Sequence, residues 1–179
     1  MALTSRAEAV RILEEGHATV QTLLANVGEE DFVRLATIGG GEWSAKDLVG
    51  HLATWEEAAL EALGDWRAGR TPTIETEVFA RPGAIDEYNA RTVAAKRDEP
   101  LDAVRRAVEE AHAAILSEIE GMSDDEWSSK APYPSERRRR LAELLGSITG
   151  APKRPFGHAF AHIPDLEAFR ASLLRPAQS

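Results

Sequence analysis

Three histidines stand at positions where their imidazoles could share one metal ion. His158 and His162 are four residues apart, so a helix would place both rings on one face, about 6 Å apart along its axis. His51 borders the apolar face of another segment with helical periodicity. Helical bundles build metal sites from inward side chains on facing helices, and three protein nitrogens leave a coordination position for water or substrate. The three residues are therefore candidate ligands of a divalent metal ion.

The alternative interpretation is that these imidazoles pack in the core. A single histidine beside an apolar stripe is more often a hydrogen-bonded core residue than a ligand. His17 and His112 also lie near the apolar faces of their segments and compete as ligands. Neither has a partner at chelating spacing, so we expect packing roles for both. From its own segment alone, His51 is expected to be a core residue, and only the paired histidines elsewhere favour a ligand role.

The segment that must position His51 begins with a glycine-rich turn and a helix cap. Ser44, followed three residues later by Asp47, forms a capping-box pattern that predicts the start of a helix. Trp43 is expected to anchor that helix start by packing. One face of the helix is apolar and should be buried as far as about Arg67. The residues of that face are Leu48, Leu52, Trp55, Ala59 and Leu63.

Three further amphipathic segments are long enough to form a bundle with this helix. They cover roughly 6–25, 101–121, and the stretch from near Pro155 to Leu173. Pro164 lies inside the last segment and removes one backbone hydrogen bond, so we expect a kink or a break and restart there. Four such helices predict an all-α fold, a four-helix bundle.

Shorter elements connect these helices. Between 69 and 85 no clean period is seen, which predicts a long loop between helices two and three that could act as a lid. Asp86 is expected to cap a short helix over 87–96, and further short helices are expected near Trp127 and over 141–148. No strand pattern or repeat stands out. We expect one domain over 1–175 and a C-terminal tail over 176–179.

Composition limits the classes of function and partner. The 179 residues are 43% hydrophobic, enough for a core without disulfides or a structural metal. The net charge of −9 argues against a nucleic-acid partner or an anionic membrane surface, because phosphate neutralisation needs basic side chains. The chain has no cysteine, which fits a reducing compartment and excludes a thiolate nucleophile. No apolar run could span a bilayer, so we expect a cytoplasmic protein.

A resemblance to a known family rests on four segments: GEWSAKDLVGHLATW, EYNARTVAAKRDEPLDAV, LSEIEGMSDDEW and GHAFAHIPDLEAF. They resemble the DinB-like (YfiT-like) superfamily and, within it, most closely the ClbS/DfsB branch. The W-S-x-K-D-x-x-x-H and H-x-x-x-H-I-P-D-[IL] blocks are the more specific parts. The resemblance implies a four-helix bundle that holds a divalent metal, often nickel or zinc, through three histidines. The matching positions are His51, His158 and His162.

The resemblance also implies a range of activities. The superfamily includes transferases and isomerases that use a low-molecular-weight thiol such as mycothiol or bacillithiol. The colibactin-protection branch is similar to a cyclopropane hydrolase, and its members do not always keep the histidine triad. We therefore expect a metal-dependent enzyme, a thiol-dependent transferase or a hydrolase, acting on a small electrophilic compound. The alternative is a non-catalytic bundle that sequesters a small molecule or metal.

Four residues near the candidate ligands have predicted roles at the site. Asp47 and Asp165 are candidate hydrogen-bond acceptors that fix an imidazole tautomer, although a helix cap explains Asp47 equally well and an acidic residue after Pro164 explains Asp165. Trp55 and Tyr88 are candidate pocket residues, and Tyr88 could hydrogen-bond a substrate because it follows the long loop. The predicted partner is a small molecule, and a homodimer is compatible with this class although no exposed stripe identifies its interface.

Overall fold

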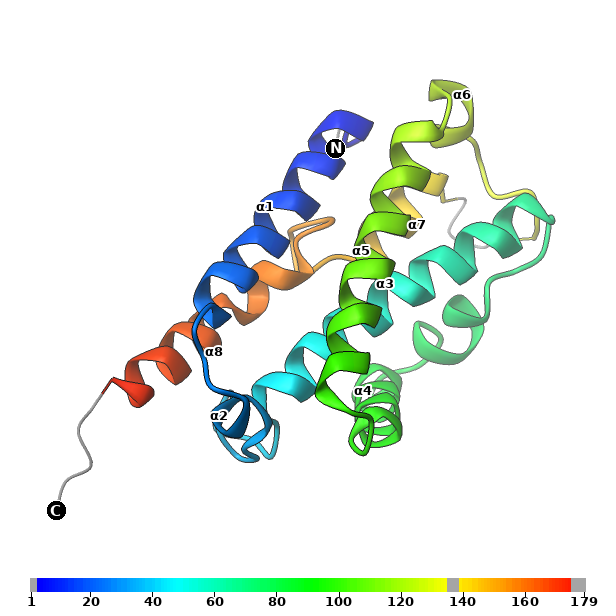
Figure 1. Cartoon of the computed structure of the whole chain (residues 1–179). Helices are drawn as coiled ribbons and strands as arrows, with labels where there is room; N and C mark the ends of the chain where they lie inside the picture. The colour runs from blue at the N-terminus through cyan, green and yellow to red at the C-terminus, as the bar shows by residue number, and fades with distance from the viewer. Residues whose placement is uncertain (1–2, 135–138, 175–179) are drawn as a thin grey trace, which may run out of the picture.

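The computed structural model describes residues 3–134 and 139–174, and its secondary structure there is helical with no strand. Four long helices form the bundle: α1 (Arg6–Leu24), α3 (Ala45–Arg67), α5 (Leu101–Gly121) and α8 (His158–Leu173). α1 packs against both α8 and α5, and α3 packs against α5 (Figure 1). The predicted all-α four-helix bundle is therefore confirmed. The predicted tail over 176–179 lies outside the described residues.

The connecting segments contain shorter helices. These are α2 (Glu29–Val33), a single π-helical turn η1 (Ile74–Val78), α4 (Ala84–Lys96), α6 (Asp124–Trp127) and α7 (Leu141–Ile148). The expected loop over 69–85 thus contains η1. α4 begins earlier than predicted, and Gly83 rather than Asp86 precedes it. Gly83 has a left-handed φ of 81°, which glycine adopts at little cost, so the chain turns into the helix there.

The start of α3 is fixed by reciprocal hydrogen bonds. The backbone N–H of Ser44 donates to Oδ2 of Asp47 over 2.9 Å, and the backbone N–H of Asp47 donates to Oγ of Ser44 over 3.1 Å. This arrangement confirms the predicted capping box. Nζ of Lys46 donates to the carbonyls of Arg97 and Glu99, over 2.6 and 3.0 Å. The first turn of α3 is therefore tied to the connection between α4 and α5.

The turn that precedes α3 depends on glycine. Gly39 and Gly40 have φ values of 62° and 69°, in the left-handed region. The chain then returns so that the backbone N–H groups of Thr37 and Ile38 both donate to the carbonyl of Trp43, over 3.0 and 3.1 Å. The W-S-x-K-D block is thus the structural support for the first turns of α3.

The last helix begins later than predicted. Its first residue is His158, whereas Pro155 belongs to the preceding turn. Phe156 has a left-handed φ of 62°, which is incompatible with a helix, and its backbone N–H donates to the carbonyl of Gly146 over 3.1 Å. The helix then runs through Pro164 without breaking. Leu166 and Phe169, both buried beyond the proline, hold this part of α8 in the bundle.

The buried apolar residues form two clusters, and α3 contributes to both. Leu48 packs in one with Val104, Leu166 and Phe169, while Trp55 packs in the other with Ile115. His51 lies on α3 between Leu48 and Trp55 and is itself only 3% exposed. A buried polar side chain therefore lies between the two halves of the core, where its nitrogens need partners other than water.

Candidate metal centre

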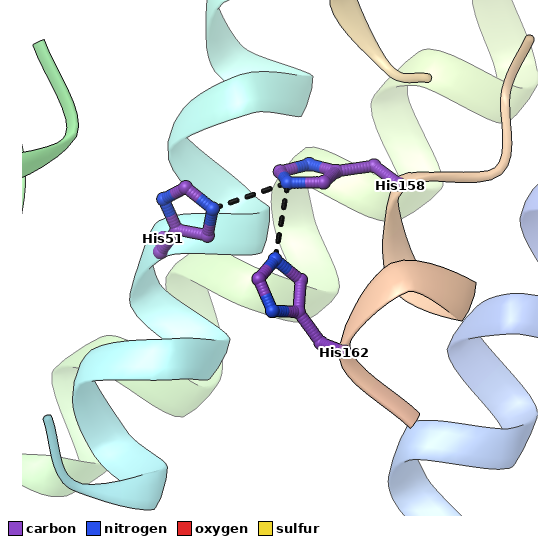
Figure 2. A group of neighbouring side chains, drawn as sticks. All are labelled: His51, His158 and His162. Carbon is purple, nitrogen blue, oxygen red and sulfur yellow. Dashed lines mark hydrogen bonds between the residues drawn. The ribbon is translucent and has the colours of Figure 1, made fainter. Parts of the chain in front are cut away.

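The imidazoles of the three predicted ligands converge on one point between α3 and α8 (Figure 2). Nε2 of His158 lies 3.1 Å from Nε2 of His51 and 3.3 Å from Nε2 of His162. One ligand atom from each residue lies within 4.8 Å of the others, and no second such group of three is found in the described part of the chain. The structure therefore brings together side chains from distant parts of the sequence.

The spacing of these nitrogens suits one bound ion better than mutual hydrogen bonds. Nitrogen ligands at about 2.0–2.1 Å from a tetrahedral zinc ion lie about 3.3 Å from one another. A neutral imidazole nitrogen carries either a proton or a lone pair, so Nε2 of His158 cannot donate to one neighbour and accept from the other. An ion would accept all three lone pairs at once. Three imidazole nitrogens are a donor set that suits zinc and nickel.

The electrostatics of the site keep the three rings neutral. Burial, reinforced by the other two imidazoles, lowers the pKa of His51 to about 2. Burial and the neighbouring His162 lower the pKa of His158 to about 3. Burial also lowers the pKa of His162, although the carboxylate of Asp165 acts in the opposite direction. Near neutral pH the lone pairs are therefore available to a metal, because no proton competes for them.

The two aspartates predicted to orient the ligands lie in different surroundings. Oδ2 of Asp165 is 3.8 Å from Nδ1 of His162, a distance longer than a hydrogen bond. The carboxylate of Asp47 is held by Ser44 in the capping box and makes no hydrogen bond to His51. Nδ1 of His51 is buried and has no hydrogen-bond partner in the described residues. The predicted contact between Asp47 and an imidazole is therefore corrected, because the helix cap engages this carboxylate.

A cavity of about 320 Å³ lies beside the triad. It is lined mainly by apolar and aromatic groups: Trp43, Trp55, Phe79, Ile85, Ile148, Ala151, Pro152 and Ala161, with the triad and the polar Asn89 and Ser147. Trp55 thus lies where a pocket residue was predicted. Its ring packs nearly parallel to Phe79, with centroids 6.3 Å apart, and edge-on to His158 at 5.8 Å.

Tyr88 does not line this cavity. Its ring packs edge-on against Trp55 with centroids 5.2 Å apart, and it lines a separate cavity together with Glu61. Asn89, one residue further along α4, lines the cavity beside the triad instead. The prediction that Tyr88 lines the pocket beside the triad is therefore wrong, and its neighbour Asn89 lines that pocket instead. Adjacent side chains on a helix point about 100° apart, so a shift of one position changes the surface that a side chain faces.

A second cavity of about 320 Å³ meets the first at Trp43 and His162. It is lined by the glycine turn before α3 and by the carboxylates of Glu42 and Asp165. The triad can therefore be approached from an apolar side and from a polar, acidic side.

The two competing histidines form a separate pair. The rings of His17 and His112 stack with centroids 3.9 Å apart and an angle of 7° between their planes. Nδ1 of His112 lies 3.0 Å from Oε1 of Glu56, and Nε2 of His17 lies 3.4 Å from Oε1 of Glu109. Because the rings are parallel, their nitrogens point to different carboxylates and do not meet at one point. This arrangement agrees with the packing roles predicted for both residues.

Solved structures with similar folds come from several proteins of low sequence identity. An uncharacterised protein from Escherichia coli UTI89 is 14% identical, with a TM-score of 0.76 and 95% of each chain covered. The colibactin self-resistance protein ClbS, in complex with dsDNA, is 14% identical, with a TM-score of 0.69 over 99% of this chain and 100% of that one. DfsB, described as a sibling lethal factor precursor, is 14% identical, with a TM-score of 0.59 over 95% and 93%. No curated protein matches the sequence significantly.

The predictions about partners need one correction. ClbS has this fold and was solved bound to dsDNA, so the exclusion of nucleic acid is wrong. Net charge sums over the whole surface, whereas contact with phosphates requires only a local group of basic side chains. For the membrane, no helix of residues 3–134 and 139–174 combines the length and hydropathy of a bilayer-spanning segment.

The family assignment rests on the sequence itself. The model of the DinB superfamily matches residues 12–164, well over half of the chain. This range includes His51, His158 and His162, and the folds of ClbS and DfsB agree with the predicted resemblance. The chain therefore belongs to the DinB superfamily.

Proposed function

We propose that this protein is a divalent-metal-dependent enzyme that joins a low-molecular-weight thiol to a small electrophilic compound. The observation that carries the proposal is the convergence of three neutral imidazole nitrogens on the wall of an apolar cavity. His51, His158 and His162 would hold the ion. An ion held in this way would lower the pKa of a thiol or water at its open coordination position.

The cavity supports an uncharged, largely apolar electrophile. Among its described lining residues there is no lysine, arginine, aspartate or glutamate. Trp43, Trp55 and Phe79 offer aromatic surface on which a planar or hydrophobic compound can pack. Its volume of about 320 Å³ is at the lower end of the range for ligand pockets, which limits the compound to a small molecule.

Thiol transfer fits this lining better than hydrolysis does. The described lining of the apolar cavity has no carboxylate, whereas Glu42 and Asp165 line the second cavity. A free thiol has a pKa of about 8.5 and water one of about 15.7, so the thiol needs far less help to lose its proton. Because the chain has no cysteine, the thiol would be a cosubstrate, and we retain the cytoplasm as the predicted location because thiols stay reduced there.

The second cavity supports a route for that cosubstrate. It reaches His162 from the polar side, next to Asp165 and Glu42, whereas the electrophile would lie against the aromatic side. Two approaches to one site allow both reactants to be held together, which replaces a collision in solution by a reaction within one complex.

Metal content tests the site. Protein purified without a histidine tag, stripped with EDTA and reloaded with zinc or nickel should retain about one ion per chain after desalting, as measured by mass spectrometry. His51→Ala and His162→Ala should lose this ion, whereas His17→Gln removes an imidazole outside the triad and should retain it. If wild type and His51→Ala retain equal amounts of metal, the proposed centre is wrong.

Turnover separates an enzyme from a sequestering protein. A panel of low-molecular-weight thiols is incubated with an aryl-substituted conjugated ketone, and thiol loss is followed with metal-loaded wild type and with His51→Ala. Consumption of many equivalents per chain by wild type alone supports thiol transfer. Binding of one equivalent without turnover would instead support sequestration, and product formation without any thiol would show that water, and not a thiol, is the nucleophile at the site.

A further inference from the structure

Asn89 is held in one orientation beside the triad. The indole Nε1–H of Trp55 donates to Oδ1 of Asn89 over 3.1 Å. An indole N–H can only donate, so the amide atom that faces it must be the oxygen. The amide NH₂ group is thereby directed away from Trp55, and no described residue accepts a hydrogen bond from it. Asn89 therefore brings a fixed donor to the lining of the cavity beside the triad.

An unpaired donor in an apolar cavity favours a ligand with a matching acceptor. Leaving such a group without a partner after water is displaced costs free energy, so a bound molecule that lacks an acceptor is disfavoured. Apart from the triad and the indole of Trp43, the described lining has one other polar side chain, Ser147, which already donates its hydroxyl to the carbonyl of Glu143 over 2.7 Å. Asn89 is therefore the side chain best placed to distinguish one small apolar compound from another.

We propose that Asn89 recognises a carbonyl oxygen on the electrophile, so that the substrates are uncharged carbonyl compounds. A carbonyl oxygen accepts the amide N–H without bringing a net charge into a cavity whose described lining has no lysine or arginine. A carboxylate would have to take the open coordination position of the metal, which the proposed function assigns to the thiol, and a hydrocarbon or alkyl halide would leave the donor unpaired. The catalytic part of this proposal rests on the proposed thiol transfer, but the binding part does not.

The same contact would assist the reaction. When the thiolate sulfur bonds to the β-carbon of a conjugated carbonyl compound, the π electrons shift and the carbonyl oxygen gains negative charge. The proton lost by the thiol to solvent is then returned from solvent to the α-carbon, so the product is a simple adduct with no leaving group. An N–H group aimed at that oxygen binds it more strongly as its charge grows, which lowers the barrier.

Binding of two matched small molecules tests the role of Asn89. Acetophenone and ethylbenzene have similar size and shape, but only acetophenone has an acceptor oxygen. EDTA-treated ¹⁵N-labelled protein is titrated with each, and the side-chain NH₂ signals of Asn89 and the indole N–H of Trp55 are followed by NMR. Wild type should bind acetophenone more tightly than ethylbenzene, and the Asn89 NH₂ signals should shift with acetophenone.

Two variants separate recognition from structure. Asn89→Asp keeps an oxygen that accepts from Trp55 but replaces the NH₂ donor, whereas Asn89→Ala removes both. Both variants should reduce the ratio of acetophenone to ethylbenzene affinity by about tenfold, the effect of one hydrogen bond. A purely structural role would leave the ratio in Asn89→Asp at the wild-type value, and this result would overturn the proposal.

The remaining outcomes are also decisive. Failure of wild type to bind acetophenone, or an Asn89 NH₂ signal that does not move at saturation, would overturn the proposal too. Because the titrations use metal-free protein, a failure of the metal site affects retained metal and thiol turnover but not this affinity ratio. The two proposals can therefore fail separately.

Discussion

Acidification should destabilise the metal-free protein strongly and at an unusually high pH. The folded state lowers the pKa of His51 to about 2 and that of His158 to about 3, from an ordinary value of 6.5. Below about pH 6.5 the unfolded chain therefore binds protons that the folded chain does not. Because protons favour the state that binds them, stability falls as the pH decreases from 6.5 and continues to fall to about pH 3.

The size of the effect follows from the proton difference. One group that is protonated only in the unfolded chain removes about 1.4 kcal/mol per pH unit. Between pH 7.5 and 5.5, His51 and His158 together should lower the free energy of unfolding by about 3 kcal/mol. The pKa values of His162 and His17 are also lowered and add to the loss. This interval lies above the titration of ordinary carboxyl groups, so histidines dominate it.

Urea unfolding followed by tryptophan fluorescence measures this dependence. The matched control is the double variant with His51→Gln and His158→Gln, which removes the two buried imidazoles and leaves His162 and His17 in place. Its stability at pH 7.5 need not equal that of wild type, because the comparison is between the pH slopes. Averaged between pH 7.5 and 5.5, the slope of the variant should be smaller by about one proton. Equal slopes would refute the inference that these imidazoles are buried and neutral.

Four further predictions concern stability, each read from unfolding midpoints. Zinc should raise the free energy of unfolding of wild type by about 2.7 kcal/mol when free zinc is 100 times its Kd, but not that of His162→Ala; equal shifts would contradict the site. Ser44→Ala should cost about 1 kcal/mol by removing the cap of α3, and no loss would argue against that cap. Gly64→Ala should stabilise α3 by up to about 1 kcal/mol, because its Cβ meets no atom within 4 Å. Gly146→Ala should destabilise the protein by about 1–3 kcal/mol, because its Cβ would lie 2.8 Å from the ring of Phe156. If Gly146→Ala were as stable as Gly64→Ala, the close contact with Phe156 would have to relax at little cost.

Local patterns predicted the elements of the fold well. The capping box at Ser44 and the apolar spacing after it gave the start and end of α3 to within a residue. The start of α8 could not be found in this way, because the left-handed φ of Phe156 is imposed by its backbone hydrogen bond to Gly146 and not by its residue type. α4 similarly begins where Gly83 reverses the chain, and Asp86 only resembled a cap.

The candidate site was predictable in its ligands but not in its surroundings. The i, i+4 spacing of His158 and His162 implies a shared face, whereas their approach to His51 depends on how α8 packs in the bundle. Tyr88 and Asn89 differ by one position, and sequence periodicity does not show which of them faces the triad when the helix has no clear apolar stripe. The orientation of Asn89 depends on a bond to Trp55, 34 positions away, which no local pattern shows.

The distance along the chain between the ligands affects how much a bound ion would stabilise the folded protein. His51 and His158 are 107 positions apart. An ion shared by them would close a polymer loop containing most of the chain, as a disulfide between the same helices would. The entropy lost on closing a loop grows only slowly with its length, but loops of this size are already near the upper end of the stabilisation that a cross-link gives. A chain cut short before α8 would lose this closure together with two of its three anchoring points.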